Sequence, residues 1–291
     1  MTINLLITGS DGFIGRNLTR SFTSNSLFSI YPTTRSIIDL TNHQRLSDYI
    51  VENNIDIVIN STVTINDLSN NLAIYYSLER ATRFCSQVIM FGSGAEYGTH
   101  SYKPLMDENY FNTLNPPHVS DTYSNSKFAI SRLHQASQIT NLYNLRLFGV
   151  YGVYEDYTRR FISNNIYKYF TQGKLQYNRN LAFDYLFTDD LYSALLAFIL
   201  CSTKPNRQTY NVCSGKPMKF SYIINTIKEY FQLPSSSIEL TNPAPTTYEY
   251  SGNPSLFEQE FNHKILQTPL YDSLTPISEW IQHDILENTI H

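Results

Sequence analysis

A tyrosine and a lysine stand four positions apart in the segment Tyr123-Ser124-Asn125-Ser126-Lys127, which is predicted to be helical. Residues at i and i+4 share one face of a helix, so the phenol and the ammonium are expected side by side. A nearby ammonium favours the phenolate form of a tyrosine and so lets the phenol give or take a proton near neutral pH. Tyr123 and Lys127 are therefore candidate acid–base residues. The same spacing also describes two surface residues of an ordinary helix.

A serine turn lies thirty residues before this pair, in the segment GSGAEYG at residues 92–98. The segment follows a strand predicted at residues 87–91. Open α/β sheets bind ligands at the carboxyl ends of their parallel strands, where Ser93 would stand. Its hydroxyl could hold a carbonyl oxygen beside Tyr123, or it could only cap a turn.

A glycine-rich turn, TGSDGFIG at residues 8–15, joins the first predicted strand to the first predicted helix. In that position Gly9, Gly12 and Gly15 would make the tight turn, let the backbone approach a pyrophosphate, and let the helix pack on the strand. The free N–H groups at the helix N-terminus would bind the phosphates. Glycines also occur in ordinary strand-to-helix turns, but the position between strand and helix favours a dinucleotide site.

Arg35 follows the second predicted strand, twenty residues beyond Gly15. An NAD site usually has a carboxylate near this distance for the ribose 2′-hydroxyl, whereas an arginine suits the 2′-phosphate of NADP. No acidic residue occurs between Asp11 and Asp39, so NADP(H) is the expected cofactor. Arg35 could instead be a solvated surface residue. Asp39 and Leu40 would border the adenine, unless Asp39 caps the following helix.

The elements that must position these residues alternate between short apolar strands and amphipathic helices. Strands are predicted at 3–8, 27–31, 55–60, 87–91 and 144–148. Helices between them are indicated by the spacing of Ile14, Leu18 and Phe22, and of Leu46, Tyr49 and Ile50. This alternation predicts an α/β fold with a Rossmann-type, doubly wound parallel sheet.

The pattern changes after about residue 154, where an aromatic helix is predicted at 161–170 and six of the twelve prolines fall between Pro234 and Pro276. A smaller C-terminal substrate-binding lobe is therefore expected, interleaved with the sheet. We assign residues 1–153 and about 184–208 to the cofactor-binding domain, and about 154–183 and 209–291 to the lobe. Residues 99–120 are long enough to form a mobile substrate lid.

Composition excludes several other classes of protein. The 291 residues carry a net charge of −4 and only 16% are charged, so nucleic acid is not expected as a partner. No apolar run approaches the ~20 residues of a membrane helix, and the first residues lack a secretion signal, so a soluble cytoplasmic protein is expected. The three cysteines and seven histidines show neither disulfide nor metal-ligand spacing.

Together the glycine turn, Ser93, the Tyr123–Lys127 pair and the segment LRLFGVYG at residues 145–152 resemble the extended short-chain dehydrogenase/reductase family, the nucleotide-sugar epimerase/dehydratase group. The resemblance covers roughly residues 1–215. It implies a catalytic trio of Ser93, Tyr123 and Lys127, with Lys127 also touching the nicotinamide ribose. It further implies a nucleotide diphosphate sugar as substrate and a homodimer. The implied cofactor contacts also include Asp11, Phe13, Ile14, Ser61, Thr62 and Phe148.

Departures from the family pattern narrow the reaction. Dehydratases carry an Asp-Glu pair directly after the catalytic hydroxyl, where this chain has Gly94 and Ala95. The fucose synthases of the family place a cysteine at the position of Ala95. Elimination and double epimerisation are therefore not expected, and Glu96, one place late, could face the substrate or only the loop.

A 4-keto reductase and a 4-epimerase remain. Arg35 favours the reductase, because NADPH is the usual dissociating reductant, whereas a 4-epimerase retains NAD. The serine turn most resembles reductases that finish 6-deoxyhexoses for surface polysaccharides, of which CDP-abequose synthase is an example. A non-catalytic cofactor-binding protein on the same fold would need the glycines but not the trio.

The expected substrate contacts also depart from the family pattern. The family often has an arginine near the nucleotide diphosphate, directly before the Asp-Phe pair, and here Phe183 stands at that position. Arg160 or Arg179 could supply the cation, and Asn165 is a weaker candidate. Each could equally be a solvated or structural residue of its helix or loop.

Overall fold

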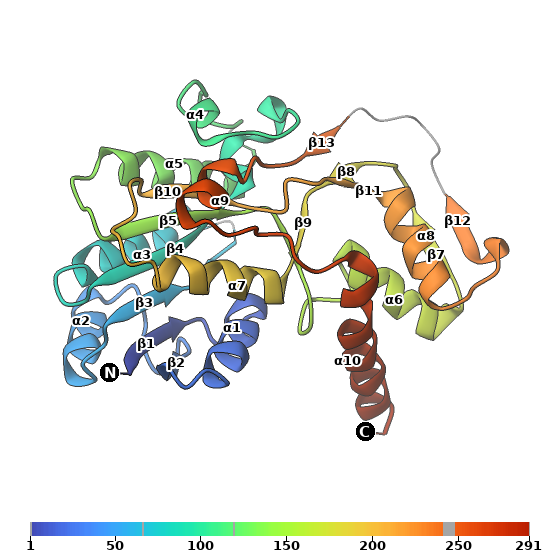
Figure 1. Ribbon diagram of the computed structural model, residues 1–291, viewed down its shortest axis with the longest axis horizontal. Helices are drawn as coiled ribbons and strands as arrows, with labels where there is room; N and C mark the ends of the chain where they lie inside the picture. The colour runs from blue at the N-terminus through green and yellow to red at the C-terminus, as the bar shows by residue number, and fades with distance from the viewer. Residues whose placement is uncertain (1, 66, 119, 241–247, 291) are drawn as a thin grey trace.

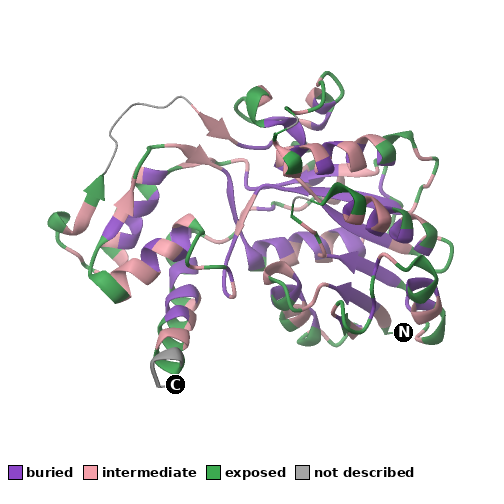
Figure 2. Cartoon of the chain, turned by 180° about the vertical axis from the view of Figure 1, so that it is seen from behind, coloured by how far each residue is buried: buried purple, intermediate pink, exposed green. Residues whose placement is uncertain are grey.

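The computed structural model describes residues 2–65, 67–118, 120–240 and 248–290. Its centre is a sheet of six parallel strands in the order β10-β5-β4-β3-β1-β2 (Figure 1). These strands are β1 (Ile3–Thr8), β2 (Phe28–Thr33), β3 (Ile57–Asn60), β4 (Gln87–Ser93), β5 (Leu142–Leu147) and β10 (Thr209–Val212). Strands β3 and β5 are buried along their whole length, as expected where helices cover both faces. Figure 2 shows the same burial across the sheet.

Two layers of helices cover the sheet. Helices α1 (Phe13–Thr23) and α7 (Thr188–Ile199) pack on one face through Leu18, Phe22 and Leu195. On the other face lie α2 (His43–Glu52), α3 (Leu68–Ala81) and α5 (Thr122–Ala136). The fold is therefore the predicted doubly wound α/β fold. Strand β1 lies between β2 and β3, so the strand order reverses beside β1, where such sheets bind ligands.

A smaller lobe, drawn on the right of Figure 1, has its own apolar core. That core is formed mainly by three helices, α6 (Phe161–Gln172), α8 (Phe220–Tyr230) and α10 (Leu270–Ile290). Short strands connect them: β6 (Gly149–Tyr151), β7 (Leu175–Tyr177), β8 (Ala182–Phe183), β9 (Tyr185–Phe187), β11 (Met218–Lys219), β12 (Ile238–Leu240) and β13 (Glu249–Tyr250). The remaining elements are α4 (Glu108–Phe111), α9 (Ser255–Phe261) and three 3-10 helices, η1 (Gly94–Tyr97), η2 (Thr99–Ser101) and η3 (Ser235–Ser237).

The chain returns to the sheet after residue 208, which differs from the expected assignment of 209–291 to the lobe. Strand β10 pairs with β5. Helix α9 packs against it, with Phe257 and Phe261 on Tyr210 and Phe198. The apolar spacing of a short helix indicates that one side is buried but not which layer buries it, so this assignment was wrong for β10 and α9.

The segment expected to be a mobile lid is anchored along much of its described part. The Met106 side chain is fully buried, and Met106 exchanges backbone hydrogen bonds with Ser251 and Asn253 at 3.0 and 2.9 Å. Arg132 of α5 donates hydrogen bonds to the carbonyl groups of Phe111 and Leu114. These contacts hold residues 106–114 between α5 and the C-terminal part of the chain, and movement of the segment as a lid stays a prediction.

Candidate active site

The glycine turn has the geometry that a dinucleotide site needs. Gly9 has a φ of +68°, a conformation that favours glycine, and its carbonyl accepts a hydrogen bond from the Gly12 N–H at 3.0 Å. A Cβ atom on Gly15 would lie 2.1 Å from the Gly9 carbonyl oxygen, so only glycine lets α1 approach β1 this closely. Gly12 is the N-cap residue of α1 and has no side chain to cap the helix, so the N–H groups at the N-terminus of α1 are available to bind an anion.

The polar residues expected at the cofactor floor lie directly against this turn. The Ser61 hydroxyl donates to the carbonyl oxygens of Thr8 and Gly9, at 2.6 and 3.2 Å. The Thr62 hydroxyl oxygen is 2.8 Å from the position that a Cβ on Gly9 would take. Phe13 and Ile14 form the first, half-buried turn of α1. The two hydroxyl residues thus support the Gly9 backbone rather than only lining a surface.

A small cavity of about 90 Å³ continues from the glycine turn to the end of β2. Six predicted cofactor residues line it, namely Gly9, Asp11, Arg35, Asp39, Leu40 and Thr62. Sequence distance alone does not show that these residues share one cavity, because they come from the ends of three strands. The exposed Arg35 is the cation of this group.

Asp39 accepts hydrogen bonds from the backbone N–H and the hydroxyl of Thr41, at 3.0 and 2.8 Å. These bonds, together with nearby Arg35, lower the pKa of Asp39. The cap of α2 is Asn42, whose side chain accepts from the Arg45 N–H. The alternative role of Asp39 as the cap of that helix is therefore wrong.

The candidate trio comes from β4 and α5. Asp121 caps α5 by accepting the Ser124 N–H at 3.1 Å, and the helix then carries Tyr123 and Lys127 in its first turns. The Lys127 ammonium donates a 2.7 Å hydrogen bond to the carbonyl of Phe91, two residues before Ser93. Helix α5 also packs against η1, which directly follows Ser93. The structure thus brings the trio to the carboxyl edge of the sheet.

Ser93 is the last residue of β4 and also caps η1. Its hydroxyl accepts a hydrogen bond from the Ala95 N–H at 3.1 Å, and its own N–H donates to the Glu96 carboxylate at 3.0 Å. The two alternatives for Ser93, a turn cap and a site hydroxyl, are compatible, because a capping hydroxyl keeps a further lone pair and its proton.

Glu96 does not face the substrate side. Its side chain is 1% exposed and forms a buried ion pair with Arg146 of β5. The Asn144 amide also donates to it, at 3.3 Å. The expectation that Glu96 contacts substrate is therefore wrong, because its carboxylate is buried in an ion pair with the Arg146 guanidinium.

The other substrate candidates differ in how exposed they are. Asn165 is 1% exposed, donates to the Phe161 carbonyl at 2.9 Å and accepts from the Gln176 N–H at 2.7 Å. It therefore joins α6 to β7 and is not available to a ligand, which corrects that expectation. Arg160 and Arg179 are both exposed on the lobe, so their role in substrate binding stays a prediction.

Two tyrosines near the predicted trio, Tyr102 and Tyr250, were not predicted from the sequence. Phe148, expected at the cofactor, is buried and lies 5.1 Å from Tyr250, measured between ring centres. Tyr250 and Tyr102 lie close enough to Tyr123 to interact with it electrostatically. With 23 tyrosines in the chain, the sequence held no signal that selected these two.

Asp184 is a third residue that the sequence did not single out. It is fully buried and accepts hydrogen bonds from the N–H and hydroxyl of Ser214 and from the N–H groups of Gly215 and Gly252. Burial raises the pKa of this carboxyl despite those bonds. Asp184 therefore joins three segments of the chain, at residues 184, 214–215 and 252.

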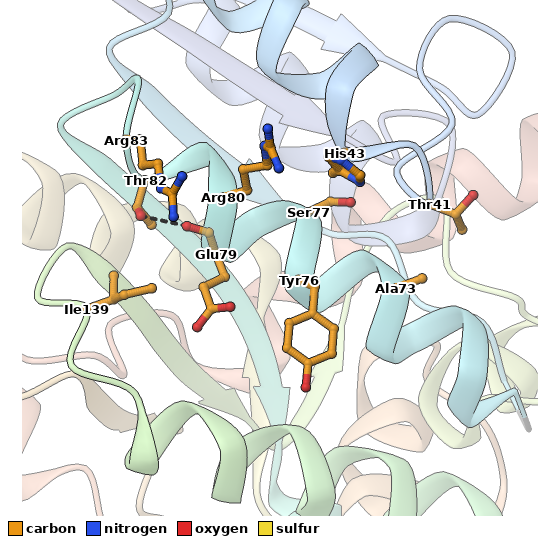
Figure 3. Close-up of a pocket in the computed structure, with 10 residues that line it drawn as sticks. All are labelled: Thr41, His43, Ala73, Tyr76, Ser77, Glu79, Arg80, Thr82, Arg83 and Ile139. Carbon is orange, nitrogen blue, oxygen red and sulfur yellow. Dashed lines mark hydrogen bonds between the residues drawn. The ribbon is translucent and has the colours of Figure 1, made fainter.

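A further cavity, of about 640 Å³, lies over α3 and contains none of the predicted site residues (Figure 3). His43, Tyr76 and Arg80 are among its lining residues. Among the described residues, no group of His, Cys, Asp or Glu side chains is placed to hold a metal ion. Over the same residues, no helix combines the length and apolarity needed to cross a bilayer.

Comparison with known proteins agrees with this geometry. The model of a family described as the NAD dependent epimerase/dehydratase family matches residues 5–213. No curated protein has significant sequence similarity to the chain.

Three solved structures share the fold at low sequence identity. UDP-glucose 4-epimerase from Thermotoga maritima is 14% identical, with a TM-score of 0.79 over 97% of this chain and 100% of that one. A GDP-6-OMe-4-keto-L-xylo-heptose reductase from Campylobacter jejuni is 15% identical, with a TM-score of 0.76 over 97% and 98%. A GDP-D-glycero-L-gluco-heptose synthase from the same organism, solved in the presence of NADPH, is 16% identical, with a TM-score of 0.78 over 97% and 98%.

Proposed function

Since this chain belongs to the NAD-dependent epimerase/dehydratase family, we propose that it reduces the C4 ketone of a nucleotide-linked 4-keto-6-deoxyhexose with NADPH. One observation supports this proposal: an arginine stands at one end of the cofactor site, and the carboxylates of a dehydratase are missing at the other. Arg35 lines the cavity beside the glycine turn, and the serine turn carries Gly94 and Ala95 where a dehydratase needs carboxylates.

The residues present fit a bound NADP(H). The uncapped N-terminus of α1 would receive the pyrophosphate, and Arg35 would pair with the ribose 2′-phosphate. A phosphate dianion pairs with an arginine far better than a 2′-hydroxyl does, because the hydrogen bonds are then charge-assisted. The bound cofactor supplies the hydride.

Three side chains would act on the sugar. Ser93 would donate a hydrogen bond to the C4 oxygen and orient the ketone, and Tyr123 would give its proton to that oxygen as negative charge develops. Lys127, held at the end of β4 by its bond to Phe91, would keep positive charge beside the phenol and bind the nicotinamide ribose. No base is required at C5, which suits the absence of a carboxylate at positions 94 and 95.

The deciding assay mixes the protein with NADPH or NADH and a panel of CDP-, dTDP-, GDP- and UDP-linked 4-keto-6-deoxy sugars. Oxidation of one NADPH for each sugar reduced supports the reductase, and a preference for NADPH over NADH supports the role of Arg35. Interconversion of two sugars without net NADPH oxidation would show the alternative, a nucleotide-sugar 4-epimerase with retained NAD. Cofactor binding without turnover of any sugar would show the second alternative, a non-catalytic cofactor-binding protein.

Two further proposals concern binding. The interleaved lobe, which exposes Arg160 and Arg179 among its cations, would bind the nucleotide diphosphate part of the substrate. A homodimer would form through α3 and α5, which pack side by side. These helices expose the apolar side chains of Leu68, Tyr76 and Leu133.

A further inference from the structure

A cavity of about 900 Å³ lies where the lobe meets the segment that leads into α10. Its lining comes from β6, β9 and β11, from the loop before β11, from the first turns of α8 and from residues 266–270 (Figure 1). Among the described residues, it shares no lining residue with the glycine turn, the serine turn or the Tyr123–Lys127 pair. The cavity is therefore distinct from the candidate active site.

Two buried tyrosines form one wall of this cavity. Strands β6 and β9 pair in parallel, with Tyr151 opposite Phe187 and Gly149 opposite Tyr185, so Tyr151 and Tyr185 lie on the same face of the pair. Their rings are perpendicular, with centres 5.9 Å apart. The Tyr151 hydroxyl is bonded to Ser273 at 2.9 Å.

The Tyr185 hydroxyl differs from that of Tyr151. The Tyr185 side chain is 9% exposed, and its hydroxyl has no hydrogen-bond partner in the part of the chain that the structure describes. Leaving a buried polar group without a partner costs free energy. Because Tyr185 lines the cavity, a ligand bound there would supply the missing partner.

The charged side chains in the lining are all cationic. Lys216 and Lys219 line the cavity, and both are exposed. No Asp or Glu is among the described residues of the lining. Neither lysine forms an ion pair with a described carboxylate. Both ammonium groups are therefore available to an anionic ligand.

Two helices begin at this cavity and add to its positive potential. Lys219 is the N-cap residue of α8, and α10 begins at Leu270, which also lines the cavity. A helix N-terminus carries a partial positive charge. The Ser221 N–H of α8 is already bonded to the Asn180 side chain at 2.9 Å. The lysines therefore supply hydrogen bonds to an anion, and the helices supply mainly their dipoles.

We propose that this cavity binds a nucleotide, an anion that also carries a planar ring. Lys216 and Lys219 bind the phosphates, and the ring packs against Tyr185 and the apolar side chains of Met218 and Leu270. The volume lies within the roughly 300–1,000 Å³ of small-molecule sites, whose linings likewise combine apolar side chains with a few polar groups. The proposal does not rest on the proposed function, because it uses none of the catalytic or cofactor residues.

Isothermal titration calorimetry on the full chain tests this binding. Excess NADP⁺ is present to occupy the cofactor site, and the titrants are ADP, CDP, GDP, UDP and inorganic pyrophosphate. We expect at least one nucleoside diphosphate to bind about 10-fold or more tightly than pyrophosphate, because the ring buries apolar surface. Equal affinity for pyrophosphate would reduce the cavity to an anion site and overturn the proposal, as would the absence of any nucleotide binding.

Substitution of the lysines locates the bound nucleotide. Lys216→Ala/Lys219→Ala should raise its Kd about 10-fold or more, because charge-assisted contacts to phosphate are lost. Lys174→Ala, at an exposed lysine of the lobe outside the cavity, is the control and should leave the Kd unchanged. A rise in Kd for Arg160→Ala/Arg179→Ala but not for the lysine variant would place the nucleotide at the proposed sugar-nucleotide site and overturn the proposal. These measurements need no turnover, so they decide the matter even if the proposed function fails.

The role of the Tyr185 hydroxyl is tested by Tyr185→Phe, with Tyr151→Phe as the matched control. Without ligand, Tyr185→Phe should leave Tm unchanged, because no hydrogen bond within the protein is lost. Tyr151→Phe should lower Tm by a few degrees, because Ser273 loses its partner. Tyr185→Phe should also raise the Kd of the nucleotide about 3- to 10-fold. An unchanged Kd would show that the hydroxyl does not contact the ligand and would overturn this part of the proposal.

Discussion

At the scale of single residues, the direction of a side chain decides whether its chemistry is available. Ser93 and Glu96 are three positions apart in one turn, yet the Ser93 hydroxyl is half-buried at the edge of the sheet and the Glu96 carboxylate is buried against Arg146. Charge explains the difference, because a guanidinium buried inside the protein requires a partner. Of these two side chains, only the Ser93 hydroxyl is therefore placed where a ligand could reach it.

Replacing Tyr123 with phenylalanine tests the proton donor. The substitution removes one oxygen from a half-buried side chain, so the fold and the cofactor site should persist. We expect kcat to fall at least 100-fold, which is the usual contribution of general acid catalysis. NADPH binding, measured by fluorescence titration, should change less than about twofold. Activity equal to that of the parent protein would contradict the mechanism.

Replacing Arg35 with alanine tests the choice of cofactor. Loss of a charge-assisted contact to the 2′-phosphate should raise the Kd of NADPH about 10- to 100-fold and leave the Kd of NADH nearly unchanged. Arg45→Ala is the control, since Arg45 lies on α2 and pairs with Glu52 outside the cavity. Equal weakening of NADPH and NADH would show that Arg35 does not contact the 2′-phosphate.

At the scale of elements, the site is held by a unit formed from β4, η1, α5 and β5. Arg146 of β5 is fully buried, and its guanidinium lies over the Phe111 ring at 4.2 Å and over the Tyr97 ring at 5.4 Å. Its partner Glu96 also accepts the N–H of Ser93. The ion pair therefore connects the sheet interior to the backbone of the serine turn.

Removing one charge of this buried pair should lower the free energy of unfolding far more than removing both charges. Arg146→Met leaves the Glu96 carboxylate buried without its cation, so we expect a loss of about 3–5 kcal/mol in the free energy of unfolding. The double variant Arg146→Met/Glu96→Gln should recover a large part of that loss. Urea denaturation measures both changes. A double variant as unstable as the single one would show that packing, rather than charge, dominates here.

The N-terminal turn of α6 provides a pH test. Glu155 accepts a 2.6 Å hydrogen bond from Ser163 and is 5% exposed, and burial raises its pKa from the ordinary 4.5 to about 7. Between these values the folded protein keeps the proton and the unfolded chain loses it. This contribution to stability is thus complete below pH 4.5 and is lost as the pH rises to 7, a change of about 3 kcal/mol.

Glu155→Gln removes this titration and keeps an oxygen for Ser163. Relative to the parent protein, the variant should gain about 3 kcal/mol of stability between pH 4.5 and pH 8, as measured by urea denaturation at several pH values. The exposed Glu239→Gln is the control and should show no such trend. A constant difference across that pH range would contradict the raised pKa of Glu155.

At the scale of the whole molecule, the site depends on the return of the chain from the lobe to the sheet. Residues 251–253 pair with Met106, and Asp184 binds the backbone at Ser214, Gly215 and Gly252. These contacts bring Tyr250 to the turn that follows β4. The substrate side of the site is therefore assembled from segments more than 100 residues apart.

The proposed dimer is tested through the exposed face of α3. Tyr76 is 51% exposed on that helix. We expect the parent protein to have twice the chain mass by light scattering, and Tyr76→Glu to shift it toward the monomer, because a carboxylate is costly to bury at an apolar contact. Tyr222→Glu, on the lobe helix α8 and 56% exposed, should leave the mass unchanged. A monomeric parent protein would contradict the dimer.

The parallel sheet, the glycine turn and the three side chains at the edge of the sheet could be predicted from the sequence. Strand Ile3–Thr8 has the predicted bounds, and Tyr123 and Lys127 lie on the predicted helix. These features follow from local periodicity and from short spacings, which a sequence states directly.

Four features could not be predicted from the sequence: the direction of the Glu96 side chain, the burial of Asn165, the anchoring of residues 106–114 and the position of Tyr250. Each of these depends on a partner in another element of the fold: Arg146, Gln176, Ser251 and Phe148, respectively. Burial of charged and aromatic side chains is determined by the packed whole, because the free energy of a buried group depends on the groups that surround it. Spacing along the chain carries no record of those neighbours.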